Sequence, residues 1–412
     1  MSVLAGMKYQ IFPLSAASDR ELRQRASRLA EGLGNVGLDV AGQPFVHEYP
    51  RDLIERAVVA AASTDELAAG LRRVADGEPD NLVVTGQASI VGDGPVWVFS
   101  GHGSQWPGMG RDLLGESEFA AVIDALEPVF SDEIGFSPRE AIQSGDFQDV
   151  AKAQTMIFAM QVGLAALWRS RGVHPAAIIG HSVGEIAAAV CSGMLSLADG
   201  GRLICRRSRL LRRVAGRGGM AMVMLSFADV QERLSHRDGL VAAIESAPTA
   251  TVIAGVPEAI DTVVRQWQAE GIAVRRISSD VAFHSPQMEQ LVAGLEEASA
   301  DLCPGVPAVP VYSTALPDPR AGVTADGKYW AANLRNPVRL ATAITAAAED
   351  GFRDFLEVSP HPVVTHSIGQ TLTADGTFVA GTLRRGKPER LTFLKSAAAV
   401  YCRGFNLAWS RQ

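Results

Sequence analysis

The sequence is poor in cysteine: its 412 residues contain four, at positions 191, 205, 303 and 402. No two of them form a Cys-x-x-Cys pair, and they are not gathered with histidines into a cluster. Metal centres need ligands at short, recognisable spacings, and disulfide frameworks need many cysteines in a short chain. The sequence therefore predicts neither a metal site nor a disulfide framework, and it favours a reducing, cytoplasmic setting.

An excess of basic residues is also absent. The formal net charge is −7 and the isoelectric point is near 5.7, so the global charge does not attract the chain to nucleic acid or to an anionic membrane. The first residues lack a basic segment followed by an apolar one, which predicts no signal peptide. The apolar stretch 156–168 is interrupted by Gln161 and falls short of a membrane span. We expect a soluble protein with no nucleic-acid or membrane partner.

The chain does have the composition and length of a multidomain globular protein. Hydrophobic residues make up 47% and charged residues 20%, and the length allows two or three domains. Residues 1–94 form the first, a small α/β domain with two expected strands and two expected helices. Ser18 and Ser63 each precede a glutamate by three positions, which is typical of a capping box at a helix start. We expect the helices over 18–33 and 63–77.

From residue 95 onwards, expected strands and helices alternate. The first strand, VWVFS, is a short continuous apolar run suited to a parallel sheet that is covered on both faces. Strand–turn–helix units in this order predict an α/β fold with a mainly parallel sheet. The later elements expected in this body are a helix over 152–171, a strand over 176–182, and helices over 183–191 and 197–213.

Residues 219–280 have a different pattern. Their expected elements follow the order β-α-β-β-α-β, which predicts a ferredoxin-like subdomain. We therefore expect an α/β-hydrolase-like large subdomain, made of 95–218 and 281–388, that carries this small subdomain as an insert. The tail, 389–412, contains a helix and then GFNLAWSRQ, which has no evident place in either body.

Ser182 lies in Gly-His-Ser-Val-Gly, between an expected strand and an expected helix. This pattern is typical of a nucleophile elbow, in which small residues two positions away on each side let strand and helix pack closely. The N–H of Val183, at the helix N-terminus, would then point toward a developing oxyanion. The alternative is a plain turn serine that caps the helix.

A serine nucleophile needs a base, and the chain has eight histidines. His181 is too close along the backbone to reach its neighbour, so we expect it to line the pocket. His284, in AFHS, lies where the small subdomain rejoins the large one, which favours it as the base. The alternative is a single histidine packed in a loop.

Five motifs extend the pattern: FSGHGSQWPGMG, GHSVGE, CRRSR, AFHS and NLRNPVRL occur in this order and at suitable spacings. Together they resemble the acyltransferase domain of modular or iterative type I polyketide synthases, which is related to malonyl-CoA:acyl-carrier-protein transacylases. The resemblance spans about 95–385. Residues 1–94 resemble the linker between ketosynthase and acyltransferase, and 389–412 resemble the linker that follows the acyltransferase and wraps back.

The resemblance implies a role for each matched residue. Ser182 is the nucleophile that becomes acylated, and His284 is the general base and later the acid. A backbone carbonyl near Asn333, rather than a carboxylate, orients the imidazole. The backbone N–H groups of Val183 and His102 are the oxyanion donors. The family commonly has glutamine where this chain has His102; because the donor is main chain, we expect the oxyanion hole to be kept.

Two further residues match substrate-binding positions. Arg207 matches the arginine that holds a free carboxylate of the substrate, which a planar guanidinium grips with two hydrogen bonds. Gln154 matches a glutamine of the same pocket. Without the resemblance, Arg207 belongs to a basic helix that is mostly a solvated face. The remaining arginines of this helix are candidates for contact with an acidic carrier protein: Arg202, Arg206, Arg209, Arg212, Arg213 and Arg217.

The same resemblance bears on the acyl group. A carboxylate-binding arginine implies malonyl or an alkylmalonyl. Phe283 beside His284 resembles malonyl selection, because its ring fills the space of an α-methyl group, and Val183 favours the same choice. Rejecting one methyl by shape is worth about 1–3 kcal/mol, so leakage to methylmalonyl is expected. Glu245 stands where the family commonly has asparagine, and the sequence assigns it no effect.

The expected reaction is therefore a ping-pong transfer from CoA to Ser182, and then to the phosphopantetheine thiol of an acyl carrier protein, with no cofactor bound by the domain. The alternatives are a thioester hydrolase that uses the same serine and histidine, an acyltransferase for a non-carboxylated group, and a non-catalytic docking scaffold. Arg207 favours transfer, and the presence of both Ser182 and His284 disfavours a scaffold. The flanking segments imply a neighbouring ketosynthase in a larger synthase.

Overall fold

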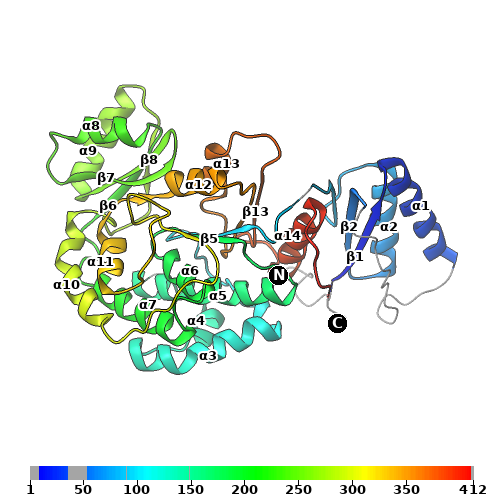
Figure 1. The fold of residues 1–412 in the computed structure, drawn as a ribbon, viewed down its shortest axis with the longest axis horizontal. Helices are drawn as coiled ribbons and strands as arrows, with labels where there is room; N and C mark the ends of the chain where they lie inside the picture. The colour runs from blue at the N-terminus through cyan, green and yellow to red at the C-terminus, as the bar shows by residue number, and fades with distance from the viewer. Residues whose placement is uncertain (1–8, 36–52, 90, 148, 410–412) are drawn as a thin grey trace. The chain divides into compact units, whose positions relative to one another are not determined.

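A computed structural model of the chain describes residues 9–35, 53–89, 91–147 and 149–409 (Figure 1). The signal-peptide prediction rests partly on residues 1–8, which lie outside the described residues. The chain divides into two compact units. Unit 1 comprises Met1–Gly94, Leu167–His174 and Thr382–Gln412, and unit 2 comprises Pro95–Ala166 and Pro175–Gly381.

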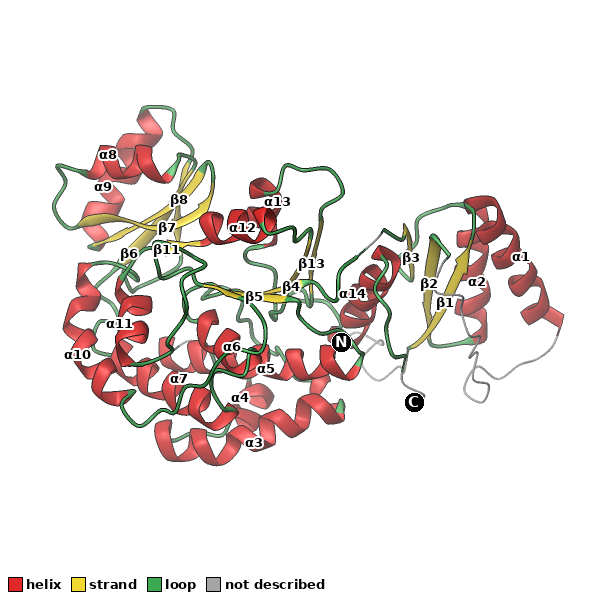
Figure 2. Ribbon diagram, in the orientation of Figure 1, coloured by secondary structure: helices red, strands yellow, loops and turns green. Residues whose placement is uncertain are grey.

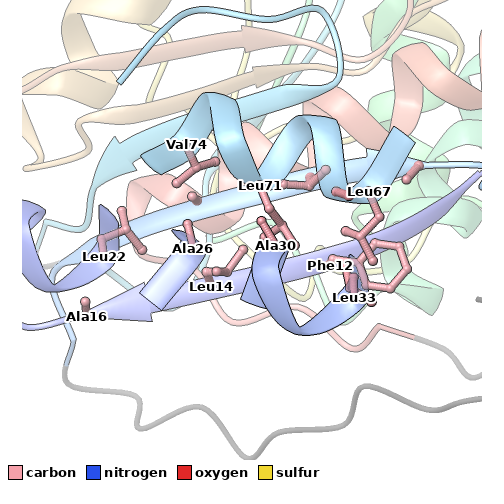
Figure 3. Close-up of a cluster of buried hydrophobic side chains, with 14 residues drawn as sticks. Phe12, Leu14, Ala16, Leu22, Ala26, Ala30, Leu33, Leu67, Leu71 and Val74 are labelled. Atoms are coloured by element: carbon pink, nitrogen blue, oxygen red, sulfur yellow. The ribbon is translucent and has the colours of Figure 1, made fainter. Parts of the chain in front are cut away.

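Unit 1 is built on a three-stranded antiparallel sheet in the order β1-β2-β3. One face of the sheet packs against two helices, and Figure 3 shows the side chains of Phe12, Leu14, Leu67 and Leu71 gathered between them. The elements are β1 Gln10–Ala16, α1 Asp19–Asn35, β2 Glu55–Ala61, α2 Thr64–Asp76 and β3 Val83–Gln87.

Both helices of unit 1 begin at the predicted capping boxes. The hydroxyl of Ser18 accepts a hydrogen bond from the Glu21 N–H at 3.3 Å, and Ser63 accepts from Glu66 N–H at 3.2 Å. Each glutamate side chain reaches back to the N–H just before its serine, at 3.1 Å and 2.8 Å respectively. These bonds satisfy N–H groups that would otherwise lack a partner at a helix start.

The C-terminal tail is part of unit 1. Helix α14, Glu389–Arg403, packs on β2 and β3, where Val58 meets Ala398 and Tyr401. Val58 faces α14 while Val59 faces the opposite core, because successive side chains of a strand point to opposite faces. The buried Arg56 donates to the Tyr401 carbonyl at 2.8 Å. Sequence analysis found no evident place for this tail; the structure shows that it covers one face of the sheet.

A five-stranded parallel sheet forms the centre of unit 2, in the order β10-β5-β4-β12-β13 (Figure 2). One face packs against α12 and α13, with Val98 and Ile179 meeting Ile344 and Ile368. Helix α6 packs against β4 and β5. The strands are β4 Val96–Phe99, β5 Ala177–Gly180, β10 Val311–Tyr312, β12 Asp354–Glu357 and β13 Phe378–Gly381.

The helices of unit 2 include the three that sequence analysis predicted around Ser182, namely α5, α6 and α7. The last turn of α5 is grouped with unit 1. Outside the small subdomain, the described helices are η1 Asp112–Gly115, α3 Ser117–Ile134, α4 Pro138–Ser144, α5 Val150–Ser170, α6 Gly184–Cys191, α7 Leu197–Leu211, η2 Pro286–Met288, α10 Glu289–Ala298, α11 Gly327–Arg335, α12 Leu340–Glu349 and α13 Thr365–Thr371.

The small subdomain has the predicted order β6-α8-β7-β8-α9-β9, and its strands pair as β7-β8-β6-β9, the ferredoxin-like arrangement. A fifth strand, β11 Val338–Arg339, joins this sheet beside β7 from the large subdomain. The other elements are β6 Gly219–Val223, α8 Phe227–Leu234, β7 Leu240–Ala247, β8 Ala250–Gly255, α9 Pro257–Ala269 and β9 Val274–Ile277. The subdomain is thus an insert whose sheet the large subdomain completes.

Glu245 lies on β7, at the edge of the sheet where β11 joins it. Its carboxylate accepts a hydrogen bond from the Thr342 hydroxyl at 2.5 Å, in the first turn of α12. A carboxylate placed at the N-terminus of a helix accepts from an N–H that has no partner within the helix, and it interacts favourably with the helix dipole. Glu245, which sequence analysis left without a role, therefore links β7 to α12.

Helix α5 is the one described helix that is long and apolar enough to cross a membrane. The expectation that this stretch is too short for a span is therefore wrong on length. Of its 18-residue apolar segment, 89% is buried inside the protein, as in the core helix of a folded domain. Gln161, which interrupts the apolar run, is buried and donates to the Ser100 carbonyl at 2.6 Å.

Candidate active site

Ser182 sits on a sharp turn between β5 and α6, in the left-handed backbone conformation, with φ 56°. The two flanking glycines are required by close packing. A Cβ atom on Gly180 would lie 2.3 Å from the Cα of Glu185, and one on Gly184 would lie 2.1 Å from the Phe99 carbonyl oxygen. The local structure is thus the strand–turn–helix elbow that the glycine spacing predicts.

The Ser182 hydroxyl and the His284 imidazole are within hydrogen-bonding distance, with Oγ to Nε2 at 2.7 Å. The other ring nitrogen, Nδ1, lies 3.0 Å from the carbonyl oxygen of Asn336. A carbonyl oxygen can only accept, so the proton of the neutral ring is on Nδ1 and Nε2 is free to accept the serine proton. Both side chains are buried.

The carbonyl that orients His284 belongs to Asn336, three residues after the Asn333 of sequence analysis. Pro337 explains the position. The residue before a proline avoids the helical conformation, so α11 ends at Arg335 and Asn336 is extended, with ψ 158°. Asn333 contributes differently: its side-chain amide donates to the Ser182 carbonyl at 3.0 Å, and its own carbonyl also raises the pKa of His284.

Burial keeps the His284 imidazole neutral. The pKa of His284 is lowered to about 3, mainly by burial and also by the neighbouring Arg207 and His181, against the opposite effect of two backbone carbonyls. His181 lies beside the elbow: a Cβ atom on Gly101 would be 2.8 Å from its Nδ1. That nitrogen is buried and has no hydrogen-bond partner among the described residues. A neutral His284 is the form that can accept a proton.

The segment around His102 lies against the elbow, as the close approach of Gly101 to His181 shows. Gln105 fixes the His102 tautomer. Its carbonyl oxygen accepts from the Gly103 N–H at 2.8 Å, so its amide nitrogen is the atom 3.3 Å from His102 Nε2 and must donate. The ring proton is therefore on Nδ1, which is buried and has no partner within the described chain. Burial lowers the pKa of His102 to about 4.

Val183 is buried and is the N-cap residue of α6, so its N–H lies at a helix N-terminus directly after Ser182. The Phe283 ring is also buried, and its centroid lies 5.8 Å from that of His102 and 6.5 Å from that of His284. Phe283 and His102 therefore form one wall next to the Ser182–His284 pair.

Arg207 is almost completely buried, with 1% of its surface exposed. Its Nη1 donates to the side-chain oxygen of Gln154 on α5. Its Nε and Nη2 are buried and have no hydrogen-bond partner in the part of the chain that the structure describes. Burial lowers the pKa of Arg207 to about 10, while the nearby Glu185 raises it, so the guanidinium is charged at neutral pH. Two adjacent unpaired donors on a buried cation form a ready site for a carboxylate.

The other arginines of the basic helix differ from Arg207. Four of them form ion pairs with neighbouring acidic residues, and two, Arg213 and Arg217, are exposed and lie beyond the end of α7. The paired residues are Arg202 with Asp199, Arg206 with Glu133 and Asp301, Arg209 with Glu133, and Arg212 with Asp149. These internal pairs weaken the idea that the helix as a whole attracts an acidic partner.

The structure thus brings together all the site residues that sequence analysis named, and it adds two that were not named. Asn336 could have been found from the proline that follows it. Glu185 stands in the GHSVGE motif, but its function depends on residues far away in the chain. The described residues contain no group of three or more His, Cys, Asp or Glu side chains able to hold a metal ion.

A serine on an elbow, hydrogen-bonded to a histidine beside a buried arginine, defines a serine-dependent acyl-transfer or hydrolase site on an α/β fold. The model of the acyl transferase domain family matches residues 96–406. The chain belongs to this family.

Relatives and solved structures agree with the family match. The chain is 48% identical to 5-methyl-1-naphthoate synthase of Streptomyces sahachiroi and 40% identical to 6-methylsalicylic acid synthase of Aspergillus terreus; the alignments include 97% and 98% of this chain. It covers 23% of the length of each of these relatives. The acyltransferase domain from module 8 of the salinomycin polyketide synthase superimposes with a TM-score of 0.92 at 34% identity, over 97% of both chains. The acyltransferase domain of PpsC of Mycobacterium tuberculosis matches 72% of this chain and 92% of its own, with a TM-score of 0.69 and 40% identity.

Proposed function

We propose that this chain transfers a malonyl group from CoA to the phosphopantetheine thiol of an acyl carrier protein through an acyl-enzyme on Ser182. The observation that carries the proposal is the pair of unpartnered, buried nitrogens on Arg207, located in the same site as the Ser182–His284 pair. A malonyl thioester offers a carbonyl to the serine and a free carboxylate to the guanidinium.

In the first half-reaction, Ser182 Oγ attacks the thioester carbonyl while His284 Nε2 takes its proton. The backbone N–H groups of Val183 and His102 stabilise the negative oxygen of the tetrahedral intermediate. The intermediate collapses, the carbon–sulfur bond breaks, and the imidazolium returns its proton to the departing CoA thiolate. Asn336 accepts from Nδ1 throughout and holds the ring in the required orientation.

The second half-reaction runs in reverse with a different thiol. The phosphopantetheine thiol gives its proton to His284 Nε2, its sulfur attacks the acyl carbonyl, and Ser182 leaves with the returned proton. Water competes for the same acyl-enzyme, so slow hydrolysis accompanies transfer. The domain binds no cofactor of its own in this scheme.

Two groups of residues in the site support malonyl as the acyl group. Arg207 with Gln154 holds the carboxylate, His181 lines the site beside the elbow, and the wall of Phe283 and His102 occupies the space of an α-substituent. Shape discrimination against one methyl is worth about 1–3 kcal/mol, so malonyl is favoured over methylmalonyl by about 10- to 200-fold.

The longer relatives support a place in a larger, cytoplasmic synthase, in which an acyl carrier protein and a ketosynthase are the partners. Because the chain spans a quarter or less of their length, the remaining domains of such a synthase would lie outside it. We assign the segment 1–94 as the linker toward the ketosynthase, 219–280 as the small subdomain between the two parts of the acyltransferase, 95–218 and 281–388, and 389–412 as the linker that follows.

The test is a competition between equimolar malonyl-CoA and methylmalonyl-CoA, followed by intact-protein mass. We expect a malonyl adduct that is absent from Ser182→Ala and strongly reduced in Arg207→Ala. Arg212→Ala is the matched control, because Arg212 directly follows the same helix but is exposed and paired with Asp149. Normal malonyl loading by Arg207→Ala would contradict the assignment of the carboxylate site.

Transfer is then distinguished from hydrolysis by adding a phosphopantetheinylated carrier protein to the isolated acyl-enzyme. We expect the malonyl group on the carrier protein. Release of free malonate at the same rate with and without the carrier protein would show that the chain is a hydrolase.

A further inference from the structure

Glu185 is a buried carboxylate beneath the nucleophile, with 4% of its surface exposed. It stands in the first turn of α6, three residues after Ser182. One carboxylate oxygen accepts from the N–H of Thr314 at 2.7 Å and lies 2.6 Å from its hydroxyl, and the other accepts from the Tyr329 hydroxyl. Burial raises the pKa of Glu185, while its hydrogen bonds with Thr314, Tyr329 and Asn333 lower it. The acyl-transfer chemistry does not use this group directly.

The partners of Glu185 lie on the segment that also holds the reacting pair. Tyr329 and Asn333 are four residues apart on α11, so their side chains share one face of the helix. Asn333 donates to the Ser182 carbonyl at 3.0 Å. Asn336, immediately after the helix, accepts from His284 Nδ1 at 3.0 Å. Helix α11 therefore contacts Ser182 through Asn333, and the residue that directly follows the helix contacts His284.

We propose that Glu185 is a positioning residue, which holds α11 against the elbow through Tyr329 and so sets the distance between Ser182 Oγ and His284 Nε2. The proposal rests on the proposed function only in taking Ser182 as the nucleophile. The alternative is that Glu185 merely satisfies donors in the core. That role also costs stability when it is lost, but it does not alter the geometry of the serine and histidine.

Glu185 also acts on the site electrostatically, and this effect can be measured separately from its hydrogen bond to Tyr329. Its charge raises the pKa of Arg207, so the carboxylate also supports the cation in the same site. Glu185→Gln removes both the charge and the strong bond to Tyr329, whereas Tyr329→Phe removes the bond and leaves the charge. If Glu185 acts through α11, the two variants share their effect on Ser182.

The chain supplies matched controls. Glu357 is a fully buried carboxylate in the same unit that accepts from the N–H groups of Val364 and Thr365, at 3.0 Å and 2.8 Å, at the start of α13. Tyr312 is a buried tyrosine whose hydroxyl donates to Asp350 at 2.7 Å. The variants Glu357→Gln and Tyr312→Phe therefore reproduce the loss of core hydrogen bonds without touching α11.

The experiment measures the rate at which a small alkyl fluorophosphonate labels Ser182, per folded molecule, in all four variants. The reagent has neither a carboxylate nor CoA, so it reports the serine–histidine pair even if the assigned acyl group is wrong. A misplacement of the order of 1 Å costs up to about 10²-fold in rate. We expect labelling slowed at least about tenfold in Glu185→Gln and in Tyr329→Phe, with wild-type rates in both controls.

The double variant Glu185→Gln, Tyr329→Phe adds a readout that a merely structural role would not produce. Because the two residues act through one link, we expect it to be labelled no more slowly than the slower single variant. Three results would each overturn the proposal: a wild-type rate for Glu185→Gln, a rate loss in Glu185→Gln that Tyr329→Phe does not share, or an equal loss in Glu357→Gln.

Discussion

Ser182 and His284 share one backbone conformation: both are in the left-handed region, with φ 56° and 57°, although neither is glycine. Among the described residues only Ala325 is a third non-glycine case. Such a conformation costs about 1–3 kcal/mol and persists only where the surrounding structure imposes it. Here it directs Oγ and Nε2 toward each other across 2.7 Å. The two residues that would exchange a proton are thus both held in a strained conformation.

The strain at Ser182 predicts a stability difference between two inactive variants. Glycine adopts positive φ freely, whereas alanine keeps the Cβ atom that causes the strain. We expect Ser182→Gly to be more stable than Ser182→Ala by about 1 kcal/mol, despite the larger chain entropy of glycine in the unfolded state. Urea or thermal unfolding of both proteins measures the difference. An alanine variant of equal or greater stability would show that the site stores no such strain.

Phe283 should control the choice between malonyl and methylmalonyl. Phe283→Leu removes the ring while it keeps an apolar side chain, and we expect the ratio of methylmalonyl to malonyl loading to rise by up to about 10-fold. Intact mass after the competition of the two CoA thioesters gives this ratio. Phe130→Leu, a fully buried phenylalanine that packs on Phe136 instead, is the control. An unchanged ratio in Phe283→Leu would assign selectivity elsewhere in the site.

The lowered pKa of His284 predicts an unusual pH profile. The base must be neutral, and because burial lowers its pKa to about 3, it stays neutral well into the acid range. We expect the labelling of Ser182 by a fluorophosphonate to be nearly constant between about pH 7.5 and 5.5, whereas a base with the ordinary pKa of about 6.5 would lose about 90% of its rate. A midpoint near 6.5 would contradict this environment for His284.

His102 predicts how stability changes with pH. Its pKa falls from 6.5 to about 4 on folding, so between these values the unfolded chain binds a proton that the folded chain does not. The folded state therefore loses about 1.4 kcal/mol per pH unit from this group as pH falls. We expect His102→Gln to lose stability less steeply than the wild type from pH 6.5 to 4.5, by unfolding in urea. Equal slopes for His102→Gln and the wild type would contradict this environment for His102.

Periodicity and capping predicted most long elements, because a strand buried on both faces and a helix with a serine cap leave local signals. Strands β4 and β5 are continuous apolar runs, and α2 begins where Ser63 predicts. The strands β10 and β11 have two residues each and carry no periodic signal. The place of α14 was not predictable either, since its apolar residues do not say which sheet they cover.

In the site too, features with a local sequence signal could be predicted, and features that depend on distant residues could not. The elbow is local, so the glycines around Ser182 predict it by sterics alone. The position of His284 at the junction of the subdomains favoured it as the base but left an alternative, and resemblance decided. Arg207 and Gln154 were assigned by resemblance alone, because nothing in a linear pattern shows that they converge. The carbonyl beside His284 was placed near Asn333; the one 3.0 Å from Nδ1 is that of Asn336, because α11 ends before Pro337, and the Asn333 carbonyl also raises the pKa of His284. Glu185 was missed because its partners lie 129 and 144 positions further along the chain.

Strand β11 has a consequence for how the molecule moves. Val338 pairs with Ile244 in the small subdomain, and only one residue separates it from Asn336, on whose carbonyl His284 rests. Such a short, proline-containing connection is stiff. Any displacement of the β7 edge of the small subdomain would therefore be transmitted to the carbonyl that orients the His284 ring.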